Sequence, residues 1–339
     1  MKKPIVIFIT KVFLFCLPII VLLSFYIIID PFKVIYHYDS YFVSGMPSYV
    51  VLDKDYVSTE TFLNNFSKYN YDSFIFGNSR SIFYQVKDWQ EHIASKRCFH
   101  FDASLETLYG LNAKFKFLMK KGIPIRNVLL ILDWSILPAT NNSSGHLFLK
   151  DPKLSGQNWL LFQIEFVKAF FDINFLHDYI DFRLTNKIEK SLMNDGVLDD
   201  RPFEYDLTSN EIRFSYYENI INTNPYDYYL PRKSLFYERS AWPQQLEPII
   251  KDEQTKLLEE IFDILIQNKA EYRIVISPLY DQIKLNTEDY DYLCNLFGRK
   301  NVYDFSGRNE ITNNVINYYD NSHYRPHVTK YILDVIYKK

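Results

Sequence analysis

Short apolar runs alternate along this chain with segments whose apolar residues recur at helical spacing. This alternation limits the possible folds more than any other feature, because strands joined by helices form right-handed crossovers and a mostly parallel sheet. The run 128–132 (VLLIL) is apolar throughout, which is typical of a strand covered on both faces. Strands are predicted at 74–76, 98–101, 128–132, 272–277 and 302–305, and helices at 106–121, 257–266 and from Pro326 onward. The pattern predicts an α/β fold with helices on both sides of the sheet.

Two stretches depart from this alternation. Residues 30–70 have mixed polarity, with Pro31, Gly45 and Pro47, and we expect them to form a connecting region. Residues 136–245 mix short apolar stretches with polar loops rich in proline and tyrosine. A segment of this length is too long for an ordinary loop, so it predicts a helical insertion at the rim of the sheet. The α/β domain is then expected over 71–339, with the insertion at about 136–245.

Residues 12–29 carry no charge and are just long enough to span a bilayer. Lysines precede this run and acids begin only at Asp30, so the positive-inside rule predicts a cytoplasmic tail (1–11), a transmembrane signal anchor (12–29) and an exported remainder. The alternatives are a cleaved signal peptide and a buried helix. The run ends in Tyr-Ile-Ile-Ile-Asp-Pro rather than in the small residues of a cleavage site, which favours an uncleaved anchor in the cytoplasmic membrane.

Composition adds two expectations about partners and thiols. The formal net charge of -3 and the pI of about 6.2 give no electrostatic footprint for nucleic acid. Cys16, Cys98 and Cys294 have no metal-ligand spacing, and free buried thiols are favoured over a Cys98–Cys294 disulfide. We expect neither a metal nor a cofactor.

Two short motifs at opposite ends of the predicted domain carry the chemistry. Ser79 stands in a Gly-led turn directly after the strand at 74–76, and Asp320 precedes His323 by three residues in a turn-like segment after the last strand. Serine, histidine and aspartate are the nucleophile, the base and the orienting acid of acyl transfer. Taken alone, each motif has a simpler explanation, since Ser79 can be a helix N-cap and His323 a capping residue. His327 lies four residues after His323, but Pro326 lies between them and a zinc site is disfavoured.

The order Ser, Asp, His, with both partners in the last loop, resembles the SGNH/GDSL hydrolase superfamily over residues 70–339, the insertion excluded. Gly77-Asn78-Ser79-Arg80-Ser81 looks like the Gly-Ser-Ser-Arg variant of its first block. The segment 320–326 (DNSHYRP) looks like the last block of its membrane-anchored, extracytoplasmic members. Those members include accessory proteins that acylate cell-surface polymers beside a membrane-bound O-acyltransferase. The resemblance implies a flavodoxin-like three-layer sandwich, with Ser79 as nucleophile, His323 as base and Asp320 as its orienting residue.

The middle of the chain departs from the family's pattern. Asp102-Ala103-Ser104-Leu105 stands where the family has its oxyanion-hole glycine, and Asp133 stands at the place of an asparagine. Since an ionised aspartate cannot donate a hydrogen bond to an oxyanion, Ser104 is the best remaining donor. Asn78, Arg80, Asp133 and Ser104 are therefore our candidates for oxyanion stabilisation or substrate binding.

The resemblance implies an esterase or O-acyltransferase acting on a cell-envelope polysaccharide or acyl ester, with a membrane-bound O-acyltransferase as a conceivable partner. The alternative expectation is an inactive scaffold that binds glycan or such a partner.

Overall fold

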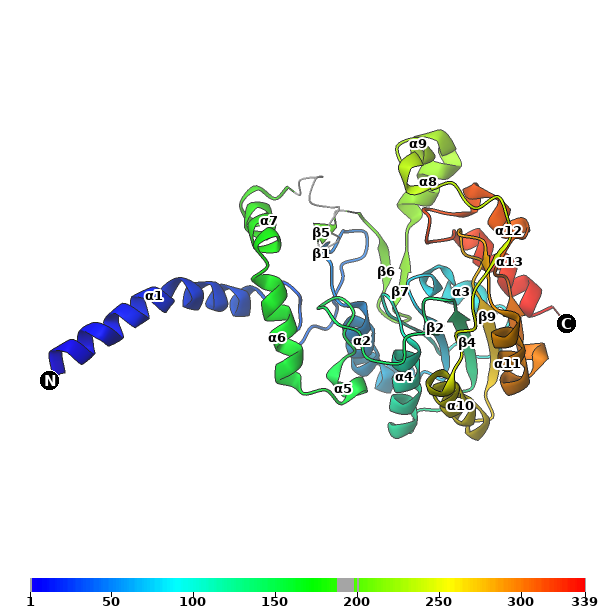
Figure 1. The fold of residues 1–339 in the computed structure, drawn as a ribbon, viewed down its shortest axis with the longest axis horizontal. Coiled ribbons are helices and arrows are strands. Elements are labelled where there is room, and N and C mark those ends of the chain that lie inside the picture. Colours follow the sequence, from blue (N-terminus) through cyan, green and yellow to red (C-terminus); the bar gives the residue numbers. More distant parts are fainter. Residues whose placement is uncertain (1, 188–197, 200, 339) are drawn as a thin grey trace.

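Five parallel strands form the central sheet of the chain (Figure 1). The structure is a computed structural model that describes residues 2–187, 198–199 and 201–338. The strands are β2 (Ser73–Gly77), β3 (Cys98–Asp102), β4 (Asn127–Leu132), β9 (Glu271–Ile276) and β11 (Val302–Asp304). Their order across the sheet is β3-β2-β4-β9-β11, which in chain order reads 2-1-3-4-5, the flavodoxin-like arrangement. The predicted α/β fold with a parallel sheet is confirmed.

Helices cover both faces of this sheet. One face packs against α2 (Lys54–Tyr69), α4 (Leu108–Lys120), α10 (Asp252–Gln267) and α11 (Thr287–Phe297), and the other against α3 (Val86–Trp89) and α13 (Pro326–Ile336). Side chains alternate between the faces along each strand, so Phe74 and Phe76 join the first cluster and Ile75 joins the second. Cys98 and Cys294 belong to opposite clusters and both thiols are free, as expected.

The register places the carboxyl ends of β2, β3 and β4 at one edge. Ser73 lies beside Cys98 on one side and beside Asn127 on the other, so the three strands begin level. The chain changes direction across the sheet between β2 and β4, since β3 lies outside β2 and every later strand lies outside β4. Open α/β sheets bind their ligands at this switch point, beyond the carboxyl ends of the strands.

A long helix, α1 (Lys2–Ile29), precedes the sheet and leaves the body of the molecule on the side away from the C-terminus (Figure 1). By length and composition it could cross a membrane, and its membrane-spanning window is almost entirely exposed. Its last turns are different, because Phe25 and Tyr26 pack against aromatic side chains of the body. After the helix, the Asp30 carboxylate accepts the backbone N–H groups of residues 34, 35 and 36 at 2.9–3.1 Å and thereby holds the turn that follows.

The region 30–70 contains more than a connection. It includes α2, which begins after Asp53, whose carboxylate accepts the backbone N–H groups of Asp55 and Tyr56. Phe62 of α2 is fully buried in the cluster beneath the sheet. A short strand, β1 (Tyr49–Val50), pairs with β5 (Leu198–Asp199).

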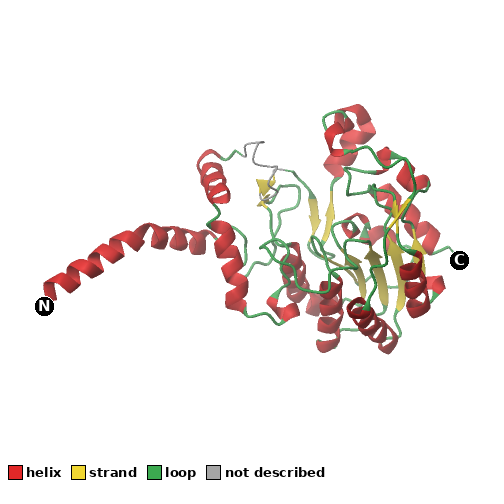
Figure 2. Cartoon of the chain, viewed as in Figure 1, coloured by secondary structure: helices red, strands yellow, loops and turns green. Residues whose placement is uncertain are grey.

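The described part of 136–245 consists of two groups of elements with different positions (Figure 2). The first group is α5 (Pro152–Ser155), α6 (Trp159–Phe170) and α7 (Ile173–Thr185), of which α6 and α7 pack against the end of α1. The second comprises the hairpin of β6 (Glu204–Asp206) and β7 (Glu211–Arg213), followed by α8 (Ser215–Thr223) and α9 (Pro225–Tyr229). Helices α8 and α9 lie beyond the carboxyl edge of the sheet. Other short elements include β8 (Gln244–Gln245), its partner β10 (Ile283–Lys284), the helix α12 (Glu310–Asn313) and the 3₁₀ turn Lys233–Leu235.

Four buried charges connect α2, α4 and the insertion. Lys114 contacts Asp55 at 3.0 Å and Glu106 at 2.5 Å, and Lys150 contacts the same two carboxylates at 3.2 and 2.6 Å. All four side chains are excluded from solvent. A Cβ on Gly110 would lie 2.1 Å from the Glu106 carboxylate and 2.3 Å from the Lys150 stem, so only glycine admits this cluster.

Candidate active site

The turn after β2 presents Ser79 at the switch point of the sheet. Gly77 ends the strand where a Cβ would lie 2.8 Å from the Ser81 side chain and 3.0 Å from Ile131 of β4, so glycine lets the turn pack closely. The Asn78 carbonyl accepts the Ser81 N–H at 2.9 Å and hydroxyl at 2.7 Å, which closes the turn. Ser79 is half-buried and lines a cavity.

The second motif lies in the loop before α13. The Asp320 carboxylate accepts the backbone N–H groups of Ser322 and His323 at 2.7 and 2.8 Å, so the carboxylate organises its own loop. His323 Nδ1 lies 3.0 Å from Asp320 Oδ2 and 3.1 Å from Oδ1. The carboxylate can only accept, so Nδ1 carries the proton and Nε2 is left with its lone pair.

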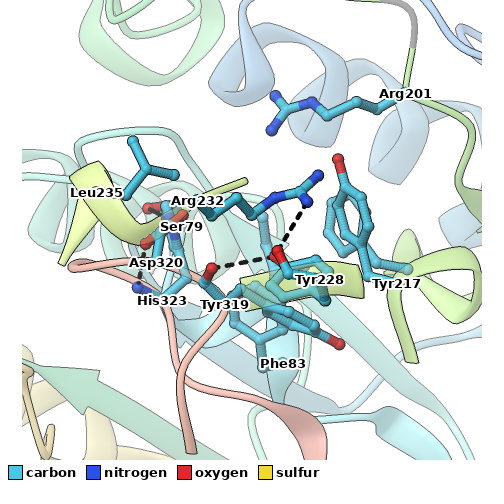
Figure 3. A pocket seen from close by; sticks show the side chains of 12 residues that line it. Ser79, Phe83, Arg201, Tyr217, Tyr228, Arg232, Leu235, Tyr319, Asp320 and His323 are labelled. Carbon is cyan, nitrogen blue, oxygen red and sulfur yellow. Dashed lines mark hydrogen bonds and ion pairs between the residues drawn. The ribbon is translucent and has the colours of Figure 1, made fainter. Parts of the chain in front are cut away.

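His323 Nε2 lies 3.0 Å from Ser79 Oγ (Figure 3). The hydrogen-bonded chain therefore runs from Ser79 through His323 to Asp320, across 244 positions of sequence. The alternative in which Ser79 caps a helix does not hold, because the following 3₁₀ turn (Ser81–Phe83) begins after Arg80 and has no side-chain cap.

The electrostatics of the Asp320 carboxyl favour its ionised form. Burial alone would raise its pKa, but the hydrogen bond to His323, the charge of that imidazole and the two backbone N–H donors outweigh it. The pKa of Asp320 therefore lies below its usual value. At neutral pH the carboxylate is charged and can stabilise an imidazolium at His323.

Asn78, Arg80 and Asp133 form a scaffold beneath the site. The Asp133 carboxylate accepts from Asn78 Nδ2 and from Arg80 Nη1, both at 2.8 Å. Arg80 also donates from Nε to the Ser322 carbonyl and from Nη2 to the Ser322 hydroxyl, each at 3.1 Å. One guanidinium therefore connects the loop of Asp320 and His323 to Asp133, which directly follows β4.

The four residues expected to contact substrate or an oxyanion do not line the cavity beside Ser79: Asn78, Arg80, Ser104 and Asp133. The donor groups of Asn78 and Arg80 bind Asp133, Ser135 and Ser322 instead. Ser104 lies just past β3, next to Ala103, whose N–H donates to the Gly77 carbonyl at 3.3 Å. In the part of the chain that the structure describes, the backbone N–H of Ser79 itself has no acceptor, so it is available to an oxyanion.

The cavity has a volume of about 250 Å³, and half of its lining residues come from the second half of the insertion (Figure 3). The Arg232 guanidinium lies over the Tyr228 ring, 4.1 Å from its centroid, and 5.3 Å from that of Tyr217. The lining residues are Ser79, Ile82, Phe83, Arg201, Phe214, Tyr217, Tyr228, Arg232, Leu235, Tyr319, Asp320 and His323. The sequence patterns did not identify the cavity residues contributed by the insertion, and the Tyr-rich segment 224–231 was the one signal that pointed there.

Helices α8 and α9 contact the loop that carries His323. Glu218 of α8 forms a two-pronged pair with Arg325, with N–O distances of 2.8 and 2.7 Å, and accepts the Tyr319 hydroxyl at 2.6 Å. Burial alone would raise the pKa of Glu218, but hydrogen bonds from Arg325 and Tyr319 outweigh it and lower that pKa. The Tyr228 hydroxyl of α9 donates to the Tyr319 carbonyl at 3.0 Å. The insertion therefore fixes the loop that carries His323.

Among the described residues, no group of three or more His, Cys, Asp or Glu side chains is placed to hold a metal ion. His327 is oriented away from such a role, since its Nε2 lies 2.9 Å from Asn317 Oδ1.

Comparisons with models of protein families, with curated proteins and with solved structures gave no match, so the α/β domain and the apolar N-terminal helix stand without an identified family.

Proposed function

We propose that the chain is a membrane-anchored serine esterase or O-acyltransferase of the SGNH type, acting on an acyl ester or polysaccharide of the cell envelope. The observation that carries the proposal is the hydrogen-bonded chain Ser79 Oγ–His323 Nε2, with Nδ1 on Asp320. Three residues from two distant motifs meet in the geometry that nucleophilic catalysis requires, at the sheet position where this topology binds ligands.

The chemistry follows from the atoms in place. Ser79 Oγ attacks the acyl carbonyl carbon while His323 Nε2 takes the hydroxyl proton, and the ionised Asp320 stabilises the resulting imidazolium. The carbonyl oxygen becomes an oxyanion, to which the Ser79 backbone N–H can donate. Collapse breaks the bond to the leaving alcohol, and the imidazolium returns its proton to that oxygen. The acyl group then passes from Ser79 to water or to a sugar hydroxyl, which His323 deprotonates.

The cavity favours a short acyl group. A volume of about 250 Å³ lies below the range of about 300–1,000 Å³ that is usual for small-molecule sites. Aromatic walls from Tyr217, Tyr228 and Phe214 restrict water around the reacting atoms, which a transfer to a sugar hydroxyl needs. An acetyl group with part of a sugar ring matches this space.

The packing of α1 supports retention of the anchor. Tyr26 is only 2% exposed and, with Phe25, contacts Phe170 of α6. Cleavage after α1 would uncover these aromatic faces, so a signal peptide explains the packing poorly. With Lys2, Lys3 and Lys11 on its N-terminal side, the helix would leave the domain outside the cytoplasm.

An inactive scaffold is the second candidate, and a specific observation favours it. Among the described residues, the expected side-chain donors are not at the reacting atoms, because Asn78 and Arg80 are engaged elsewhere and Ser104 lies outside the cavity. Loss of one donor costs about 3 kcal/mol of transition-state stabilisation. Such a domain would bind glycan or a membrane-bound acyltransferase without turnover.

Covalent labelling with a serine-directed fluorophosphonate separates the two candidates. The purified full chain should label at Ser79, and Ser79→Ala and His323→Ala should each abolish labelling and ester turnover. The double variant should be scarcely worse than either, because residues that share a step are not additive. Asp320→Asn should retain more activity, since Asp320 only orients and stabilises the imidazole.

The control is Ser144→Ala, which removes an exposed serine outside the cavity and should label like the wild type. Absence of labelling in the folded wild-type chain would reject the enzyme and leave the scaffold.

A further inference from the structure

Helices α6 and α7 carry apolar residues on the faces that turn away from the protein. On α6, Phe162, Phe166 and Phe170 are buried against the body, yet Leu160, Leu161 and Ile164 are 63%, 56% and 45% exposed. On α7, Phe175 and Tyr179 are buried. Ile173, Ile180 and Leu184 form a row on the opposite side, at 74%, 37% and 80% exposure. Helical spacing places each exposed set opposite the buried one.

Such outer faces are unusual for a helix that meets water. The outer face of α10, by contrast, exposes Lys256, Glu259 and Asp263, as expected for an amphipathic surface helix. The outer faces of α6 and α7 also carry the exposed polar residues Lys168 and His177, and large apolar side chains beside such residues are typical of a helix that lies in a membrane interface. The exposed apolar side chains of α6 and α7 therefore mark a surface that contacts another apolar phase or molecule.

The position of the two helices identifies the covering material. They pack directly on the end of α1, where Phe25 contacts Phe170 at 6.3 Å and Tyr179 at 6.4 Å between ring centroids. In Figure 1, α6 and α7 run across the direction of α1, so a bilayer crossed by α1 would lie along them. Trp159, 55% exposed, begins α6, and tryptophan is enriched where a protein meets the lipid headgroups.

The depth is consistent with this arrangement. If residues 12–29 fill the hydrocarbon layer, a rise of about 1.5 Å per residue puts Phe25 about 6 Å below its outer boundary. Interfacial helices bury their apolar face about 5–10 Å into the same zone. Side chains of α6 and α7 that contact Phe25 therefore lie at the level of the upper acyl chains.

We propose that α6 and α7 are interfacial helices, which lie in the outer surface of the bilayer with Leu160, Leu161, Ile164, Ile173, Ile180 and Leu184 among the lipids. The domain is then seated on the membrane through a second contact in addition to its anchor. This inference rests on α1 spanning the membrane and does not depend on the chemistry at Ser79.

Depth-dependent quenching on the full chain tests the proposal. The background carries Cys16→Ala, and the two remaining native thiols, Cys98 and Cys294, are buried. The single-cysteine variants are Ile164→Cys and Leu184→Cys. Tyr331→Cys on α13, where the native side chain is 50% exposed, is the control. Each is labelled with an environment-sensitive fluorophore and reconstituted into phosphatidylcholine vesicles. Labels at 164 and 184 should be quenched at least twofold by nitroxide-labelled lipid. They should also be several-fold less sensitive to aqueous iodide than the label at 331.

A label at Phe13 reports separately on α1 and shows whether the anchor spans the bilayer. If that label lies in lipid while those at 164 and 184 respond to iodide as the control does, the interfacial placement is wrong. Protection that is present in native membranes and absent in pure lipid vesicles would assign the two faces to a membrane-protein partner and overturn the proposal. Equal lipid quenching at 331 would overturn it too, because the effect would not be specific to α6 and α7.

Discussion

Replacement of Arg80 should separate the assembly of the site from its chemistry. The Arg80 side chain is 13% exposed and its partner Asp133 only 1%, so Arg80→Ala leaves a buried carboxylate without its cation. Breaking a buried pair in this way costs about 3–5 kcal/mol. Asp133 still accepts hydrogen bonds from Asn78, Ser135 and the Ile136 backbone. We therefore expect Arg80→Ala to lower the free energy of unfolding by about 3 kcal/mol, the low end of this range.

The same change releases the loop that carries His323, because both contacts to Ser322 are lost. A displacement of about 1 Å at a reacting group can cost about 100-fold in rate. Arg80→Lys is the sharper variant, since one ammonium group can keep the charge beside Asp133 but cannot also reach both Ser322 oxygens. It should lose about 1 kcal/mol of stability and still react about tenfold more slowly.

Two measurements on the full chain in detergent check this: urea denaturation, and the rate of fluorophosphonate labelling at Ser79. The control is Lys116→Ala on α4, where Lys116 pairs with Glu260 and the two side chains are 53% and 32% exposed. It should cost less than about 1 kcal/mol and leave the labelling rate unchanged. If Arg80→Lys labels at the wild-type rate, the guanidinium bridge does not position the base.

Two further predictions concern buried charge. Burial alone would raise the pKa of Asp102, but Lys54 and His100 outweigh it and lower that pKa to about 2. Its stabilisation is therefore complete above the unfolded pKa of about 4 and is lost as the pH falls towards about 2. Urea denaturation should show that the wild type loses about 2 kcal/mol more than Asp102→Asn across this window, and parallel curves would contradict this. Lys150→Met should lower the free energy of unfolding by about 4 kcal/mol, because two buried carboxylates then share one lysine. The control Lys153→Met changes a side chain that is 54% exposed and should lower it by less than about 1 kcal/mol. Similar losses for the two methionine variants would show that the buried cluster is not stabilising.

The parts of the fold that follow hydrophobic periodicity could be predicted from sequence. The strand at 128–132 and the helix from Pro326 are examples, because their buried faces are apolar. Helix α2 escaped prediction for the opposite reason. Its buried positions include Asp55, Ser58 and Thr61, which meet polar partners from distant segments, so no apolar stripe marks it.

Only part of the candidate site could be predicted from the sequence, for a similar reason. Ser79, Asp320 and His323 stand in local motifs at predictable element ends, and the structure brings them together. The contact between Arg80 and Asp133 spans 53 positions, and no local pattern reveals that the two neutralise each other. The ion pair between Glu218 and Arg325 joins residues 107 positions apart, and Glu218 lies in the insertion, which has no regular hydrophobic period. Such contacts depend on the tertiary fold, and a single sequence does not encode them as a pattern.

The separation of Ser79 from His323 along the chain has a consequence for when the candidate site can form. Ser79 directly follows β2, the first strand of the sheet to be synthesised, whereas His323 lies 244 positions later, just before α13. A growing chain therefore displays its serine long before it has a base, and the final helix must dock before the imidazole reaches its place. A chain truncated before residue 323 lacks the imidazole, so under the proposed mechanism Ser79 becomes reactive only after the loop of Asp320 and His323 has been made and has folded against β2.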